Sequence, residues 1–169
     1  VPKGERPGDF VREHAPRFGV ALPSAGFLET SGGERVGAHA GHYRFTVGQR
    51  RGIGVASAER LYVLAIEPES SRVVVGPAAE LETREARVEG LRFLSGERRG
   101  PFRAAARVRH RSPEAPATVV PAGDGSAAVL FDEPVRAVAP GQSCVFYEGE
   151  VVLGGGVLKK PSAVQTGPL

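Results

Sequence analysis

The chain has 169 residues, a mass of 17.7 kDa and a formal net charge of +3 at pH 7. Its hydrophobic share of 41% and charged share of 24% are ordinary for a folded globular protein and exclude a disordered chain. No apolar run approaches the roughly 20 residues of a membrane-spanning helix, and a single cysteine excludes both a disulfide framework and a cysteine-based zinc cage. The 23 glycines and 14 prolines make long helices scarce and favour turn-rich β structure.

The sequence begins with valine, contains no methionine and shows no secretory leader at its start. Because translation starts at methionine, we expect a fragment of a longer protein, or a product that lacks its N-terminus. The activity of the whole protein is then expected to involve residues outside this chain.

The first half of the sequence predicts one short helix and several strands. Asp9 is expected to cap the helix, and Pro16 to end it, because proline cannot donate the backbone hydrogen bond that a helix needs. Short strand pieces are expected within 21–41, on either side of a turn at Gly32-Gly33. Further strands are predicted at 42–47, 61–66 and 72–75, the last two as a hairpin, with a basic glycine-rich loop at 48–54.

The second half predicts strands at intervals of roughly 8–12 residues, which is typical of a barrel or a sandwich. Tight turns are expected at Asp124-Gly125 and Glu148-Gly149. We expect a central β-rich domain over 1–83, a barrel over 84–160 and a disordered tail over 161–169. The predicted strands lie near 86–94, 102–111, 117–120, 127–131, 135–138, 143–147 and 151–158.

Arginine is concentrated in one stretch of the chain, 84–111. This stretch holds nine arginines, three glutamates and no lysine, so it carries +6 while the rest of the chain carries −3. The planar guanidinium fork suits phosphate oxygens, so the cluster favours an anionic partner. A GC-rich coding bias is the alternative, and it explains the number of arginines better than their clustering.

The predicted strand at 102–111 has two contrasting faces, because successive side chains of a strand point to opposite sides. One face is apolar and comprises Phe102, Ala104, Ala106 and Val108, together with His110. The other face carries Arg103, Arg107, Arg109 and Arg111. Successive positions of this face, which also includes Ala105 between Arg103 and Arg107, lie about 7 Å apart, close to the spacing of successive phosphates, and this indicates a nucleic-acid partner. The alternative is a solvated face whose arginines pair with acids on neighbouring strands.

Signatures of other chemistry are weak or missing in the sequence. It contains no P-loop and no G-x-S-x-G nucleophile motif. His39 and His42 have a metal-like spacing without further ligands, so a structural histidine pair is the better interpretation, and no metal site is expected. Cys144 falls within a predicted strand and is expected to be a small buried hydrophobic residue.

Three sequence blocks, in this order and spacing, resemble the C-terminal portion of the tRNA-specific 2-thiouridylases. The first is GAHAGHYRFTVGQRRGIG at 37–54, and the second is RVRHR at 107–111. The third comprises FDEP at 131–134, PGQS at 140–143, FY at 146–147 and LGGG at 153–156. The resemblance extends over the whole chain, and its GQR and PGQ…VFY…LGGG signatures are specific.

The resemblance implies a mainly β chain: a small central β-rich domain with one short N-terminal helix, then an antiparallel β-barrel like those of translation factors. It implies an enzyme that adenylates the C2 oxygen of the wobble uridine of tRNA and then delivers sulfur from a cysteine persulfide. ATP and Mg²⁺ are expected in a missing N-terminal domain, and no cofactor in this chain. The implied partners are the anticodon region of tRNA and a sulfur-carrier protein, in the cytoplasm and with no membrane.

The resemblance also suggests which residues contact tRNA. It assigns this role to Arg109, to His110 (where the family often has tyrosine) and to Gln142 of the PGQ turn. Arg107 and Arg111 join them as neighbours on the arginine face. We expect these side chains to position RNA mainly through its phosphates.

No catalytic residue is expected within the chain itself. The resemblance places the persulfide cysteine two residues before Val1, so the chain alone is expected to be inactive. The loop of Gly48, Gln49 and Arg50 matches the GQR signature and is expected to shape the mouth of the active site.

Two alternatives from other functional classes remain open. One is a stand-alone RNA-binding β-barrel that serves as an adaptor without catalysis. The other is a structural or oligomerisation module whose arginines pair with acids. The oligomeric state, the tRNA substrates and the sulfur donor stay open as well.

Overall fold

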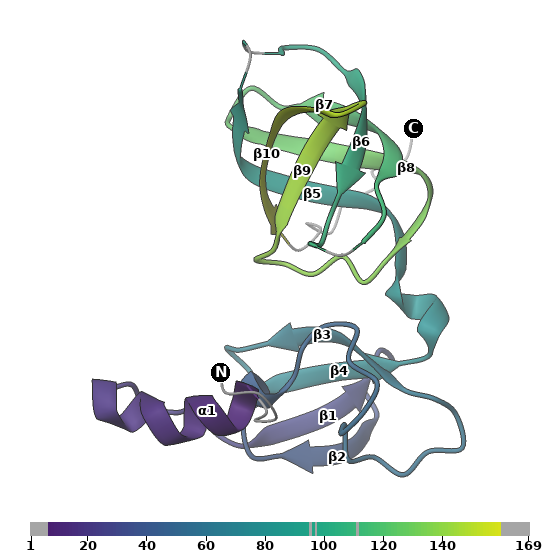
Figure 1. Ribbon diagram of the computed structural model, residues 1–169. Helices are drawn as coiled ribbons and strands as arrows, with labels where there is room; N and C mark the ends of the chain where they lie inside the picture. The colour runs from purple at the N-terminus through teal and green to yellow at the C-terminus, as the bar shows by residue number, and fades with distance from the viewer. Residues whose placement is uncertain (1–6, 95, 97, 111, 160–169) are drawn as a thin grey trace. The chain divides into compact units, whose positions relative to one another are not determined.

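The computed structural model describes residues 7–94, 96, 98–110 and 112–159 and divides the chain into two compact units, Val1–Leu81 and Glu82–Leu169 (Figure 1). The described residues are mainly strands, with one short α-helix and three 3₁₀ turns. The mainly β fold predicted from the sequence is therefore confirmed. The predicted tail at 161–169 lies outside the described residues.

The first unit is a four-stranded mixed sheet with the strand order β2-β1-β4-β3. Strands β1 and β4 run parallel, and the other two pairs are antiparallel. The fully buried side chains of Leu28, Val63, Val73 and Val75 form its core. The elements are α1 (Pro7–His14), η1 (Ala15–Phe18), β1 (Gly26–Thr30), β2 (Arg35–His39), η2 (His42–Arg44), β3 (Tyr62–Glu67), β4 (Arg72–Gly76) and η3 (Ala78–Leu81).

The turn at Gly32-Gly33 and the hairpin of β3 with β4 are confirmed, whereas the helix differs from the prediction. It begins at Pro7, so Asp9 lies within its first turn rather than at its cap. Pro16 falls at the start of η1, where its missing N–H costs nothing because the first N–H groups of a helix have no partner. Gly19, with φ of +68°, ends that turn.

The strand predicted at 42–47 is wrong, because this segment forms the 3₁₀ turn η2 instead. The amide of Phe45 donates to the carbonyl of His42 at 3.0 Å, which closes the turn. The apolar side chains that suggested a strand still pack inward, since Phe45 contacts the core and meets the ring of His39 edge-on. Strand-like pairing starts only afterwards, where Gly48 and Gln49 exchange backbone hydrogen bonds with Val63.

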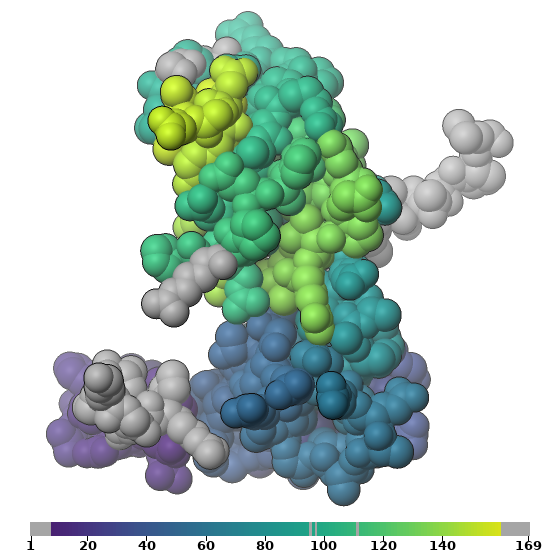
Figure 2. Space-filling model, turned by 45° about the vertical axis from the view of Figure 1, so that its right-hand side comes forward, coloured from purple at the N-terminus to yellow at the C-terminus, as the bar shows by residue number. Residues whose placement is uncertain are grey.

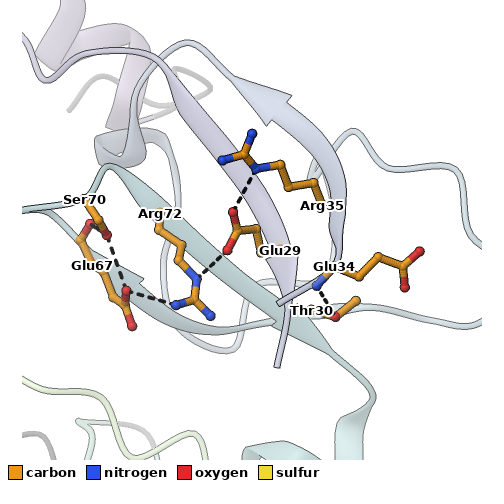
Figure 3. Close-up of polar contacts among 7 residues, drawn as sticks. All are labelled: Glu29, Thr30, Glu34, Arg35, Glu67, Ser70 and Arg72. Atoms are coloured by element: carbon orange, nitrogen blue, oxygen red, sulfur yellow. Dashed lines mark hydrogen bonds and ion pairs between the residues drawn. The ribbon is translucent and has the colours of Figure 1, made fainter. Parts of the chain in front are cut away.

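A chain of ion pairs crosses the sheet of the first unit (Figure 3). The carboxylate of Glu29 on β1 lies 3.2 Å from Arg35 on β2 and 2.9 Å from Arg72 on β4. Arg72 in turn lies 3.5 Å from Glu67 at the end of β3. These charges link all four strands, and the central carboxylate of Glu29 is only 16% exposed, whereas Arg35 at the edge is 64% exposed.

The second unit is a closed six-stranded barrel in which all neighbouring strands run antiparallel, as predicted. Alternate side chains fill its interior, with Val88, Val119, Val129, Phe146 and Leu158 fully buried. The strands follow the order β10-β5-β8-β7-β6-β9 and comprise β5 (Glu82–Phe93), β6 (Phe102–Arg107), β7 (Ala115–Pro121), β8 (Ser126–Arg136), β9 (Ser143–Glu148) and β10 (Val151–Lys159).

Turn chemistry fixes two hairpins of the barrel where they were expected. Gly125 and Gly149, with φ of +79° and +58°, adopt the left-handed conformation that tight turns require. One prediction fails: β8 runs continuously through Pro134, which was expected to separate two strands. The pairing of β5 with β8 shifts between Thr83–Val135 and Glu85–Leu130, so Pro134 lies in a bulge where no ladder hydrogen bond is needed.

Candidate nucleic-acid interface

The strand β6 shows the predicted alternation as far as Val108. Ala104, Ala106 and Val108 are buried in the barrel, with 9%, 1% and 1% of their surfaces exposed. Arg103 and Arg107 lie on the opposite side, toward solvent. The apolar face therefore builds the core, and the arginine face is left at the surface.

The sequence predicts four arginines on one strand face that are open to phosphates, and this is wrong because two of them pair with acids. Arg103 forms a two-point ion pair with Asp132 on β8, with hydrogen bonds of 2.8 and 2.5 Å. Arg107 donates a hydrogen bond of 2.7 Å to Glu114, just before β7. Glu114 precedes β7, which pairs with β6, and Asp132 reaches Arg103 from β8 on the far side of β7. Acids from nearby strands thus pair with these two arginines, which was the alternative for the arginine face. The prediction for Arg111 concerns a residue outside the described part of the chain.

The regular strand ends at Arg107, so Arg109 and His110 do not continue its two faces. The amide and the hydroxyl of Ser112 both donate to the carbonyl of Arg109, at 3.1 and 3.0 Å, and bend the chain there. As a result His110 is exposed and does not share the apolar face, contrary to the prediction. The guanidinium of Arg109 has no ion pair with any described residue.

The bend instead turns Arg109 and His110 into a groove of about 730 Å³ at one end of the barrel. Gln142 lines the same groove, although 31 residues of the sequence lie between it and His110. Figure 2 shows the green segment around the β6–β7 connection beside the paler green segment that includes the end of β8. The remaining lining comprises Ser112, Pro113, Glu114, Ala115, Pro116, Glu133, Pro134, Val135 and Arg136.

Backbone hydrogen bonds hold Gln142 at this groove. Its amide donates to Ala139 at 3.3 Å, and its carbonyl accepts from Leu158 of β10 at 2.7 Å. The side-chain amide can both donate and accept, which suits the edge of a base. An arginine, an imidazole that can stack and a side-chain amide thus line one concave surface. Proteins commonly bind single-stranded RNA with groups of these kinds.

Sequence reasoning missed the contribution of β8 to this groove. Glu133 and Arg136 line it, and Glu114 forms part of the opposite wall. Pro134 had suggested a break in the strand, and only the bulge opposite Arg84 shows that the chain continues past it. The two glutamates make the groove less basic than the arginine count suggested.

The GQR loop lies in the first unit and is held closed by its own glutamine. The side-chain oxygen of Gln49 accepts from the amide of Thr46, and its nitrogen donates to the carbonyl of Arg51, both at 3.0 Å. Gly48 has φ of +84°, which favours glycine there. Arg50 and Arg51 are exposed without an ion pair to any described residue, so the loop presents two cations to solvent.

The cysteine and the buried histidine of the described residues show no features of a reactive site. Cys144 is fully buried, and burial raises the pKa of its thiol to about 12, so no thiolate forms near neutral pH. Burial also lowers the pKa of His39, whose ring accepts a hydrogen bond from the amide of Gly41. Within the described ranges no group of three or more candidate ligands could hold a metal ion, and no helix is long and apolar enough to cross a membrane.

Comparisons with known proteins match both units. An aminomethyltransferase beta-barrel domain matches residues 83–158, and a tRNA methyl transferase PRC-barrel domain matches residues 9–77. The tRNA-specific 2-thiouridylase MnmA of Koribacter versatilis is 42% identical over 92% of this chain, and that of Acidobacterium capsulatum is 45% identical over 87%. The chain belongs to the tRNA-specific 2-thiouridylase family. It spans 42% and 41% of the length of these two 2-thiouridylases.

Proposed function

We propose that this chain holds tRNA for a 2-thiouridylase that installs sulfur at C2 of the wobble uridine. The observation that carries the proposal is the meeting of Arg109, His110 and Gln142 in one groove of the barrel. These residues come from two separate connections of the barrel. A purely structural role would not require them to line the same groove. The names of the relatives supply the substrate class.

Each of the three side chains would have its own role toward RNA. Arg109 makes no ion pair with a described residue and can pair with a phosphate, which positions the RNA without reading its sequence. His110 is exposed and can stack on an unpaired base, and Gln142 can hydrogen-bond a base edge or the sugar–phosphate backbone. Together they favour the single-stranded anticodon region over a regular duplex.

Arg107 would act indirectly in this groove. Its guanidinium is hydrogen-bonded to Glu114 and lies 5.1 Å from the ring centre of Tyr147. The ion pair neutralises a carboxylate on the groove wall that would otherwise repel phosphate. Arg111 stays in the proposal as a further phosphate contact on the strength of the family resemblance alone.

The sulfur chemistry itself would belong to residues outside this chain. Cys144 does not fit the sulfur carrier, because it is fully buried and its pKa of about 12 keeps it protonated. ATP with Mg²⁺, the persulfide cysteine and the docking of a sulfur-carrier protein would fall to the remainder of the enzyme. The loop of Gly48, Gln49 and Arg50 would border that active site and offer the exposed side chain of Arg50 to the bound RNA.

Binding of labelled tRNA to the 169-residue chain tests the proposal. We expect Arg109→Gln and Gln142→Ala each to weaken binding several-fold, with folding unchanged by circular dichroism. Arg60→Gln is the matched control, because Arg60 is an exposed cation of the first unit without an ion pair to any described residue. Equal affinities for all four proteins would contradict the proposal. The coding sequence upstream of Val1 separates the enzyme from a stand-alone adaptor, since only the enzyme requires a nearby cysteine codon.

A further inference from the structure

The first unit contains a pocket of about 480 Å³, and the proposed function assigns no role to it. Its described lining comes from the start of α1 and from 38–52, which holds the end of β2, the turn η2 and the GQR loop. Every residue of 38–52 is described, and this range lies within the first of the three signature blocks. The block therefore builds a cavity as well as an exposed loop.

Close contacts with glycines set two walls of this pocket. A Cβ at Gly41 would come within 2.2 Å of Cε1 of Tyr43, so glycine lets the tyrosine ring lie against the backbone there. A Cβ at Gly8 would lie 3.2 Å from Cα of Arg44, so the start of α1 packs tightly on η2. The carboxylate of Asp9 also lies 3.7 Å from the guanidinium of Arg44. These contacts hold the two walls in place, as is usual for small-molecule sites, which are largely pre-formed.

The rings of three described residues line the pocket. The rings of His39 and Phe45 meet edge-on with their centres 5.2 Å apart, and Phe45 also packs on the core of the unit. Burial lowers the pKa of His39, so its ring is largely uncharged at neutral pH. The side chain of Tyr43 is partly exposed, so a ligand can reach it. Planar, uncharged surface of this kind suits the stacking of an unpaired base.

The charged groups of the pocket come from different elements. Asp9 of α1 lies 3.5 Å from Arg12 and 3.7 Å from Arg44, yet its side chain is still 33% exposed. Arg51 of the GQR loop is exposed and has no ion pair with any described residue. A ligand that is only an anion would be attracted by Arg51 and repelled by Asp9. A nucleotide avoids this conflict, because its base is neutral and only its phosphate is charged.

We propose that this pocket receives one unstacked nucleotide of the bound tRNA, with its base against Tyr43 and its phosphate at Arg51. The inference rests on the proposed function for the identity of the RNA. The volume lies within the usual range of about 300–1,000 Å³ for small-molecule sites, which suits a single nucleotide rather than a duplex. Cys144, the single cysteine of the chain, belongs to the barrel strand β9, so this pocket would position the nucleotide without thiolating it.

The fluorescence of a base that reports stacking tests the inference. Anticodon stem-loop RNAs that carry 2-aminopurine at one loop position each are titrated with the 169-residue chain. At one position the bound base should be quenched by the unmodified chain and by Tyr43→Phe, whose ring also stacks, but not by Tyr43→Ser. Tyr43→Ser should also weaken RNA binding about fivefold, the lower end of the effect of removing a stacking ring. Quenching that is unchanged in Tyr43→Ser at every loop position would overturn the inference.

Arg51→Gln keeps the test decisive if circular dichroism shows that Tyr43→Ser is unstable. Arg51 is exposed and makes no ion pair with a described residue, so its replacement should leave the fold intact. The slope of log affinity against log salt should fall by about 0.7, the value for one phosphate of a single strand. Arg60→Gln is the matched control, since it removes one exposed cation of the same unit, and it should leave the slope unchanged. Equal slopes for Arg51→Gln and Arg60→Gln would overturn the inference.

Two comparisons separate this inference from the proposed function and from another ligand. If Arg109→Gln weakens binding while the Tyr43 and Arg51 variants behave like Arg60→Gln, the inference fails and the proposed function stands. If no variant in the pocket or in the groove of the barrel has an effect, the proposed function fails as well. Displacement of the quenched base by equimolar uridine 5′-monophosphate would assign the pocket to a free nucleotide and overturn the inference.

Discussion

The carboxylate of Asp132 accepts two hydrogen bonds from the guanidinium of Arg103, at 2.8 and 2.5 Å, and so occupies the side chain that begins the arginine face of β6. This pair separates the arginines of the strand by role. Arg103 is engaged within the barrel, whereas Arg109 has no such partner among the described residues. A count of arginines along the strand therefore overstates its capacity for phosphate.

We predict that Arg103→Gln leaves tRNA affinity nearly unchanged, within about twofold. The reason is that the guanidinium is engaged with Asp132 and that neither residue lines the groove. Fluorescence anisotropy with labelled tRNA checks this, with Arg109→Gln measured alongside. A loss in Arg103→Gln as large as in Arg109→Gln would show that the ion pair opens on binding.

Acid stability should depend on the same pair. Its hydrogen bonds with Arg103 lower the pKa of Asp132, so the stabilisation is present above the ordinary carboxyl pKa and is lost as pH falls through the depressed value. We predict that thermal unfolding midpoints of the chain fall more steeply below about pH 4 than those of Asp132→Asn. Parallel curves for the two proteins would contradict this linkage.

The ion-pair chain in Figure 3 should stabilise the first unit. Glu29→Gln removes the carboxylate between Arg35 and Arg72. Arg35, which is 64% exposed, loses this carboxylate, and Arg72, which is 32% exposed, keeps only its ion pair with Glu67. We expect the free energy of unfolding of this unit to fall by about 1.5 kcal/mol, measured by urea denaturation. Glu34→Gln is the control, because its side chain is exposed and makes no ion pair with a described residue. Equal losses in both variants would rule out a special role for Glu29.

The buried thiol of Cys144 should be unreactive in the folded chain. Its pKa of about 12 and its complete burial leave almost no accessible thiolate at pH 8. We predict that a thiol reagent labels Cys144 only after denaturant unfolds the barrel, with labelling followed by mass spectrometry. Rapid labelling of the native chain would reopen the possibility of a sulfur-carrying role.

The sequence predicts the architecture of the barrel well because its signals are local. Alternation in Ala104, Ala106 and Val108 marks the interior, and glycines such as Gly125 mark the turns. The errors arise where distant chain segments decide the outcome. Pro134 is accommodated by a bulge against β5, and Phe45 packs inward from a 3₁₀ turn rather than from a strand.

The candidate site follows the same division between local and distant information. Family resemblance selected Arg109, His110 and Gln142, but only the fold shows that they share a groove. The local sequence does not predict that Asp132 pairs with Arg103 or that Glu114 pairs with Arg107. Those contacts depend on how the strands pair.

Chemical-shift mapping of the ¹⁵N-labelled chain with an anticodon stem-loop RNA tests the central claim most directly. The account predicts that amide signals of Arg109, His110 and Gln142 move on titration, together with those of neighbouring residues in the first groove. The shifts should saturate with the RNA and weaken as salt is added. Saturated binding that leaves these three amides unmoved would contradict the proposed interface.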